Sequence, residues 1–280
     1  MRWTCLIFLL CLRVESQVTQ PWTQPIEALI ASGDLPQARQ RLARETAARG
    51  ETLAGLYLEA RILFEEQHYR ETLLAVQRTL TMAPTAPELY KLAALSAIRL
   101  DRLDIAEPAL KTAAQLAPED YLVHFHLGAL YYTKSLFLAA RPELEKAAQL
   151  NPGYMPALLF LGLTLEEVGD EKSTVATYRK AIELAAAQRN AREMPYIYLG
   201  RFYYRRDRFD DGLPLLEKAS EINPGSGEAW LELGKTLHGL KRDSEALAEI
   251  ETATRLDPEK KLYHARQEEL LHLMRSGSTR

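Results

Sequence analysis

The sequence predicts an all-α solenoid, a linear stack of helical hairpins, and three observations lead to this class. Prolines recur at a fixed interval, small residues recur at fixed offsets, and apolar residues follow helical spacing. The step between Pro84, Pro118 and Pro152 is 34 residues, as is the step between Pro224 and Pro258. The 72 residues from Pro152 to Pro224 correspond to two steps, one of them with four extra residues. A period of this size is typical of stacked supersecondary units rather than of one globular core.

Small residues mark the places where helices are expected to cross. Six copies begin at residues 53, 87, 121, 155, 193 and 227, and positions are counted from each copy's first residue. The twentieth and twenty-seventh positions hold Ala, Thr or Gly in every copy. Two helices approach closely only where side chains are small, so these columns predict helix crossings. The eighth position holds Ala60, Ala94, Gly128, Gly162, Gly200 and Gly234.

Larger residues, mostly apolar, fill the fourth, seventh and eleventh positions, three and four residues apart, on one stripe of a first helix. The twenty-fourth position is apolar on a second helix, so each copy is expected to form a hairpin covered by its neighbours. Copy 53–86 places Glu59 at the seventh position and Thr72 and Thr79 in small columns, which predicts looser packing there. Ala186 replaces the usual Pro in copy 155–188, and we expect a longer second helix and the largest irregularity near residues 185–195.

This pattern resembles the tetratricopeptide repeat (TPR) family, which combines an aromatic or Leu, Leu-Gly, an aromatic, a small residue, an apolar residue, Ala and a closing Pro. Copies 121–154 and 227–260 match best, and a degenerate hairpin at 19–52 carries Trp22, Ala38 and Leu42. The resemblance implies a right-handed α-solenoid superhelix of stacked TPR hairpins. The expected segments are 53–86, 87–120, 121–154, 155–188 with extension 189–192, 193–226, 227–260 and a capping helix at 261–275.

Three further prolines occupy the twenty-second position of their copies: Pro108, Pro142 and Pro214. A helix tolerates Pro only near its start, where backbone amides have no intrahelical partner. Each second helix is therefore expected to begin a few residues earlier, with Asp104 and Asp210 as N-capping residues.

The composition is that of a helical protein, with 47% apolar and 26% charged residues and a net charge of −3. Nucleic-acid-binding proteins usually present a basic stripe, and this sequence shows none, so we expect no nucleic acid partner.

The N-terminus has the features of a secretory leader. Arg2 precedes an apolar run from Trp3 to Leu12, which is too short for a stable membrane span, and cleavage is expected after Ser16. Residues 1–16 are thus predicted to be a signal peptide of an exported, periplasmic or secreted protein. The alternatives are lipid anchoring through Cys11 and a first hydrophobic helix of the stack.

No residue pattern indicates catalysis. His124 and His126 are two residues apart and point to different faces of a helix, and His124 occupies a column of packed residues. Phosphate loops, nucleophile elbows and dinucleotide fingerprints are absent from the sequence. We therefore predict a protein that is not an enzyme, with no cofactor, no metal site and no small-molecule substrate.

The predicted binding site is a groove. In the family that the sequence resembles, the first helices line a concave face, and helical geometry places positions two, five, nine, twelve and thirteen opposite the packed stripe. Aromatic residues and arginines gather there, as they do on recognition surfaces. The candidate peptide-binding residues are Tyr57, Arg61, Phe64, Lys91, Arg99, Phe125, Tyr132, Leu159, Ile197, Arg201, Tyr204, Arg205, Leu231 and Lys235.

Three cations suggest the chemistry of the partner. Arg201 and Arg205 are one helical turn apart, and Lys235 follows Arg201 by one repeat. They are hypothesised to hold a carboxylate, either a chain end or acidic side chains. The alternative is a salt-bridged face neutralised by Glu228 and Glu232.

The expected function is a non-catalytic scaffold that binds another protein or peptide. The alternative is a structural subunit or lipoprotein adaptor of an envelope complex, for secretion or pilus assembly, that docks through convex or end surfaces.

Overall fold

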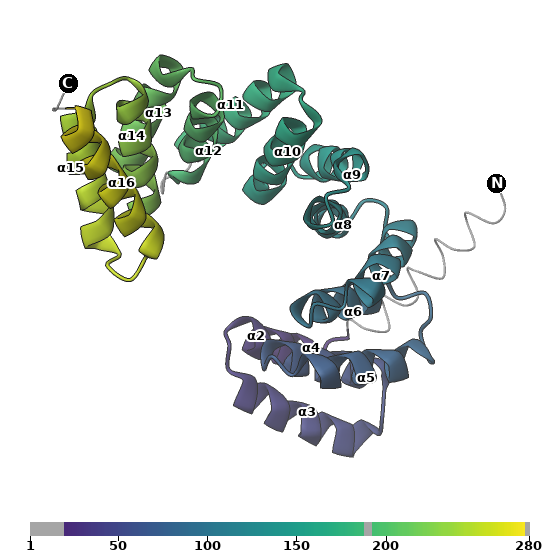
Figure 1. Cartoon of the computed structure of the whole chain (residues 1–280). Coiled ribbons are helices and arrows are strands. Elements are labelled where there is room, and N and C mark those ends of the chain that lie inside the picture. Colours follow the sequence, from purple (N-terminus) through teal and green to yellow (C-terminus); the bar gives the residue numbers. More distant parts are fainter. Residues whose placement is uncertain (1–19, 188–191, 278–280) are drawn as a thin grey trace. The chain divides into compact units, whose positions relative to one another are not determined.

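The computed structural model describes residues 20–187 and 192–277, and all regular elements in these ranges are α-helices (Figure 1). The predicted all-α fold of helical hairpins is confirmed. The expected signal peptide, with Cys5, Cys11 and Ser16, lies outside the described residues, as does most of the extension at 189–192.

The helices form two compact units, which divide after Ser135. The first unit contains α2 (Gln24–Ala31), α3 (Leu35–Arg49), α4 (Leu53–Glu65), α5 (Tyr69–Leu80), α6 (Pro87–Arg99), α7 (Leu103–Leu116) and α8 (Tyr121–Thr133). The second contains α9 (Phe137–Leu150), α10 (Met155–Val168), α11 (Glu171–Ala187), α12 (Met194–Tyr204), α13 (Phe209–Ile222), α14 (Gly227–Gly239), α15 (Asp243–Leu256) and α16 (Lys261–Gly277).

Within each unit, every helix packs against the helix that follows it in sequence. Alternate helices also touch, because α4 contacts α2 and α6, and α12 contacts α10 and α14. The first helices of neighbouring copies therefore lie side by side, as expected for a stack of hairpins that share a continuous core.

The small residues at the eighth position allow the two helices of a hairpin to cross. A Cβ atom added to Gly200 would lie 2.5 Å from Leu216 Cγ, and one added to Gly234 would lie 2.6 Å from Ile250 Cγ1. At Gly162 the added atom would enter the ring of Tyr178, which is fully buried. The interpretation of this column as a helix crossing is confirmed in the second unit.

The turn inside each hairpin places its fifteenth residue in the left-handed region of the Ramachandran map. Glycine occupies this site at Gly33 and Gly169, with φ of 79° and 81°. Side-chain-bearing residues, which pay a steric penalty there, occupy it in the other copies with φ between 55° and 64°. These residues are Gln67, Asp101, Ser135, Asp207 and Lys241.

The carbonyl of a repeat-closing proline accepts a hydrogen bond from the fourth residue of the next copy. Tyr90 Oη donates to Pro84 O at 2.9 Å, and Trp230 Nε1 donates to Pro224 O at 2.8 Å. His124 Nε2 lies 3.0 Å from the carbonyl oxygen of Pro118, and this histidine is buried. The interpretation of His124 as a packed residue is confirmed.

The prediction that Asp104 and Asp210 are the N-cap residues of their second helices is wrong. The N-cap residues of α7 and α13 are Arg102 and Arg208, and neither side chain makes a capping hydrogen bond. Asp104 and Asp210 lie in the first turn, where a carboxylate interacts favourably with the helix dipole. Pro108, Pro142 and Pro214 are accommodated inside helices that continue beyond them.

The last helix covers the end of the second unit. Tyr263 and Leu270 on α16 are buried in one cluster with Leu233 and Ile250, and Met274 packs against it. The apolar stripe expected for a capping helix is therefore present.

Candidate functional site

The described residues offer no arrangement that could hold a metal ion, because they contain no group of three or more His, Cys, Asp or Glu side chains with suitable geometry. Every buried polar side-chain atom in this part of the chain also has a hydrogen-bond partner. Searched over the same residues, the helices include none with the length and apolar character needed to cross a bilayer.

Three residues of the candidate groove belong to the core, which corrects their assignment. Ile197 is fully buried against Ala219 and Ala229, Leu231 is 4% exposed, and Phe125 is 8% exposed. All three side chains occupy the fifth position. Ile197 packs against Ala229 on the next first helix, and Leu231 lies in one cluster with Tyr263 of α16. A partner cannot reach them without displacing a helix.

In the first unit, contacts with aromatic rings hold several of the candidate groove residues in place. The guanidinium of Arg61 lies 5.8 Å from the ring centroid of Tyr57. Arg99 Nε donates a hydrogen bond to Tyr69 Oη at 3.0 Å, and the same ring packs edge-on against Phe64 at 5.5 Å. Cation–π contacts of this kind hold flexible side chains in place.

Lys91 is the centre of a second group in this unit. Its Nζ donates to Asp120 Oδ2 at 2.6 Å, and Asp120 also caps α8 by accepting from the amide of Leu122. Burial lowers the pKa of the neighbouring His126 imidazole, and the positive charge of Lys91 lowers it further. His126 is therefore stabilised as the neutral form.

Two other candidates are only partly accessible. Tyr132 on α8 is partly buried. Leu159 on α10 is partly buried and packs against the cluster that contains Tyr178 and Tyr203. Leu159 therefore contributes chiefly to the core.

In the second unit, the buried carboxylate of Glu166 on α10 joins α11 to the end of α12. Glu166 Oε1 accepts a hydrogen bond from Tyr178 Oη at 2.7 Å, and its Oε2 accepts from Arg205 Nη1 at 3.2 Å. The Tyr178 ring stacks on Tyr198 with centroids 5.9 Å apart, and the guanidinium of Arg201 lies 4.8 Å from the Tyr198 centroid. Burial raises the pKa of Tyr178, and the charge of Glu166 raises it further, so the hydroxyl remains a hydrogen-bond donor.

All three cations of the carboxylate hypothesis are already paired within the chain. Arg201 Nη1 donates to Glu228 Oε1 at 3.2 Å, and Lys235 Nζ donates to Glu232 Oε2 at 2.7 Å. With Arg205 bound to Glu166, the three positive charges are balanced by three carboxylates. The salt-bridged alternative therefore describes the resting state of this surface.

A pocket of about 210 Å³ adjoins this surface beside the capping helix. Ile250 and Leu270 give it an apolar wall, and Arg266 and Glu269 also line it. Lys235 Nζ lies 4.6 Å from the centroid of Tyr204, which also lines the pocket. The sequence of α16 predicts only a capping role, because its apolar stripe gives no sign that Arg266 and Leu270 line a pocket. We call Tyr198, Arg201, Tyr204, Arg205 and Lys235 the first-helix surface of the second unit.

Comparison with known proteins agrees with this architecture. Tetratricopeptide repeat family models match residues 91–154, 156–188 and 203–270, which together make up more than half of the chain. The human Tetratricopeptide repeat protein 13 is 28% identical over 111 residues, which represent 40% of this chain and 13% of that protein. The chain spans about a quarter or less of the length of the curated relatives it matches.

Solved structures show the same fold. The C-terminal part of a TPR repeat-containing protein from Cytophaga hutchinsonii has a TM-score of 0.67 and 16% identity, over 86% of this chain and 98% of that one. YrrB, described as a TPR protein with an unusual peptide-binding site, has a TM-score of 0.53 and 20% identity, over 69% and 98% of the two chains.

Proposed function

Because the chain belongs to the tetratricopeptide repeat family, we propose that it is a non-catalytic scaffold that binds a segment of another protein on its first helices. The observation that carries the proposal is the first-helix surface of the second unit. Glu166, Glu228 and Glu232 hold its three cations before any partner arrives. Two of these cations lie over the rings of Tyr198 and Tyr204. Preorganised aromatic and arginine side chains are the usual anchors of binding energy, because little conformational entropy is lost when they are engaged.

The charges favour a partner with a single carboxylate, such as a chain end, rather than a run of acidic residues. Arg201 and Arg205 each use one terminal nitrogen in their ion pairs within the described chain, so the other guanidinium N–H groups remain for a second acceptor. A run of acidic residues would also be repelled by the carboxylates of Glu166, Glu228 and Glu232. An aliphatic side chain next to the partner's carboxylate fits the apolar wall of Ile250 and Leu270.

Substitutions at the adjacent residues Arg205 and Arg206 test this function. A library of random peptides with free C-termini is panned against the full chain, and the selected peptides are measured by fluorescence anisotropy. Arg205→Ala and Tyr204→Ala should each weaken binding about tenfold or more, as expected for anchor residues. Arg206→Ala is the matched control, because Arg206 pairs with Glu171 and covers Phe202.

The carboxylate is tested by amidating the peptide C-terminus. Loss of affinity on amidation supports the chain-end assignment, and equal affinity of both forms excludes it while leaving the scaffold function in place. Equal binding by wild type and the Tyr204 and Arg205 variants would contradict the scaffold function at this surface.

We also propose that the protein is exported, on the basis of the leader in residues 1–16. Expression of the full chain in a bacterial host and N-terminal sequencing of the product should give a mature chain that begins at Gln17. Incorporation of labelled fatty acid that disappears in Cys11→Ala would instead establish the lipoprotein form.

The docking alternative has its own support. Leu74 and Leu138 are 68% and 79% exposed and lie on second helices, outside the first-helix surface. An envelope adaptor that docks through such outer residues should retain its partners when Tyr132, Tyr204 and Arg205 are changed together. Loss of the partners in that triple variant would favour the scaffold.

A further inference from the structure

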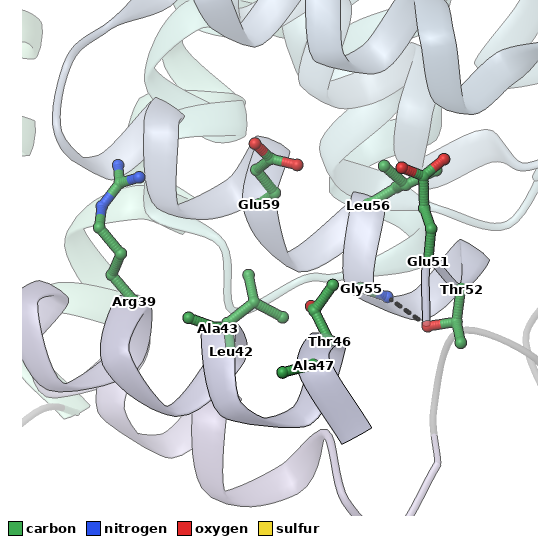
Figure 2. A pocket seen from close by; sticks show the side chains of 10 residues that line it. All are labelled: Arg39, Leu42, Ala43, Thr46, Ala47, Glu51, Thr52, Gly55, Leu56 and Glu59. Carbon is green, nitrogen blue, oxygen red and sulfur yellow. Dashed lines mark hydrogen bonds between the residues drawn. The ribbon is translucent and has the colours of Figure 1, made fainter. Parts of the chain in front are cut away.

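A groove of about 480 Å³ separates α3 from α4 in the first unit (Figure 2). Ala43 and Ala47 line it from α3, and Gly55, Leu56 and Glu59 line it from α4. Ala43 and Ala47 are exposed, whereas Gly55 and Leu56 are buried beneath them. The groove therefore has a floor of small and aliphatic groups, and its size is within the roughly 300–1,000 Å³ range of binding pockets.

One of the residues that line the groove departs from the repeat pattern. The seventh position of the first helix is apolar and buried in the other five copies, where it packs within the stack. In copy 53–86 the same position holds Glu59, which is exposed. The two other departures of this copy, Thr72 and Thr79, are fully buried, so Glu59 is the departure that lies on the surface. The five buried counterparts are Ala93, Leu127, Leu161, Leu199 and Leu233.

Glu59 also differs from the other charged groups beside it. Arg39 Nε donates to Glu66 Oε1 at 3.2 Å in a two-point ion pair, and Glu51 pairs with Arg78. Among the residues that the structure describes, no basic group lies within ion-pair distance of Glu59. The groove therefore presents one unbalanced negative charge beside an apolar floor.

We propose that this groove receives a helix of a partner protein, whose contact face carries small and aliphatic side chains around one lysine or arginine. Small residues on both walls let a third helix backbone approach closely. The basic side chain pairs with Glu59, which supplies the charge complementarity that the chain itself lacks at this point. This surface is separate from the first-helix surface of the second unit, so the two sites are tested independently.

Two synthetic helical peptides test the proposal with the full chain. Both are rich in Ala and Leu, and they differ only in one central residue, Arg or Gln. Fluorescence anisotropy should show the Arg peptide binding about fivefold more tightly than the Gln peptide, as expected for a partly desolvated ion pair. Glu59→Gln should remove that difference, whereas Glu65→Gln, a change at an exposed residue of the same helix outside the groove, should preserve it.

Two further variants separate binding from folding. Glu59→Leu restores the residue type found in other copies and should raise Tm by about 2–4 °C while abolishing peptide binding. Ala43→Trp should block the groove from α3 with Glu59 intact, because Ala43 is exposed. Equal binding of the two peptides, absence of binding by both, or binding that survives Ala43→Trp would overturn the proposal. A dimer of the wild-type chain that Glu59→Gln dissociates would also overturn it, because the occupant would be a second copy.

Discussion

At the residue scale, the hairpin turn imposes the same backbone conformation on chemically different side chains. Five residues without glycine's freedom adopt positive φ at the fifteenth position, and Gly33 and Gly169 adopt it in the remaining hairpins. The left-handed conformation costs a side-chain-bearing residue roughly 1–2 kcal/mol, partly offset by glycine's greater entropy loss on folding. The sequence shows no common residue at this position because the hairpin geometry, rather than the side chain, dictates the conformation.

Glycine at these turns should therefore stabilise the protein. Gln67→Gly and Lys241→Gly are each expected to raise the free energy of unfolding by up to about 1 kcal/mol, and Gly169→Ala to lower it by about 1 kcal/mol. Urea denaturation followed by circular dichroism measures both. Glu71→Gly is the control, because glycine at this exposed residue inside α5 should destabilise by about 1 kcal/mol.

Protonation of His126 makes the stability of the first unit depend on pH. Its pKa is lowered in the folded state by burial and by Lys91, so the unfolded chain takes up a proton first as the pH falls. The neutral imidazole of His126 therefore stabilises the folded state fully above the unfolded-state pKa of about 6.5. This contribution is lost as the pH falls through the folded-state pKa of His126.

The measurement is thermal melting between pH 7.5 and 5. His126→Gln should show a smaller loss of Tm over this interval than the wild type, since glutamine does not titrate. Parallel losses in the two proteins would show that other groups control the pH dependence.

At the element scale, the crossing of α10 and α11 depends on one pair of residues. Gly162 leaves the space that the fully buried ring of Tyr178 fills, and the ring's hydroxyl bonds to Glu166. In copy 87–120 the corresponding pair is Ala94 and Leu110, both buried in one cluster. Leucine at the twenty-fourth position faces Ala94 in one copy and Gly200 in another, whereas the larger Tyr178 ring fills the space that a Cβ at residue 162 would occupy.

A double-mutant cycle measures the coupling between Gly162 and Tyr178. Gly162→Ala should destabilise by about 1–3 kcal/mol, because the added methyl group overlaps the Tyr178 ring. Combined with Tyr178→Leu, which recreates the Ala–Leu pair of copy 87–120, the total loss should be smaller than the sum of the single losses. Additive losses in urea denaturation would contradict a direct contact.

At the scale of the whole molecule, a stack of hairpins is stabilised mainly by contacts between neighbours, so its ends need covering. In the second unit α16 provides this cover through Tyr263 and Leu270, which are both buried against α14 and α15. A Cβ added to Gly227 would lie 2.8 Å from the Tyr263 ring, so α14 is shaped to receive this helix.

Removing that ring should therefore weaken the unit. Tyr263→Ala is expected to lower the free energy of unfolding by about 3–5 kcal/mol, the range for loss of a large buried aromatic side chain. His264→Ala, on the exposed side of the same helix, should cost no more than about 1.5 kcal/mol through its bond to Pro258. Equal effects of the two variants would show that α16 does not depend on its apolar stripe.

The sequence by itself determined the helical hairpins, the phase of the copies and the crossings at small residues. These features follow from the local spacing of residues, and the same spacing occurs in every copy. Only the tertiary structure decided which first-helix residues are accessible, because each first helix packs against its neighbours as well as its own partner. That wider contact buries Ile197 and Leu231, supplies carboxylates to Arg201 and Arg205, and leaves Glu59 beside an open groove. Helical periodicity gives the direction of a side chain, but the adjoining copies determine what covers it.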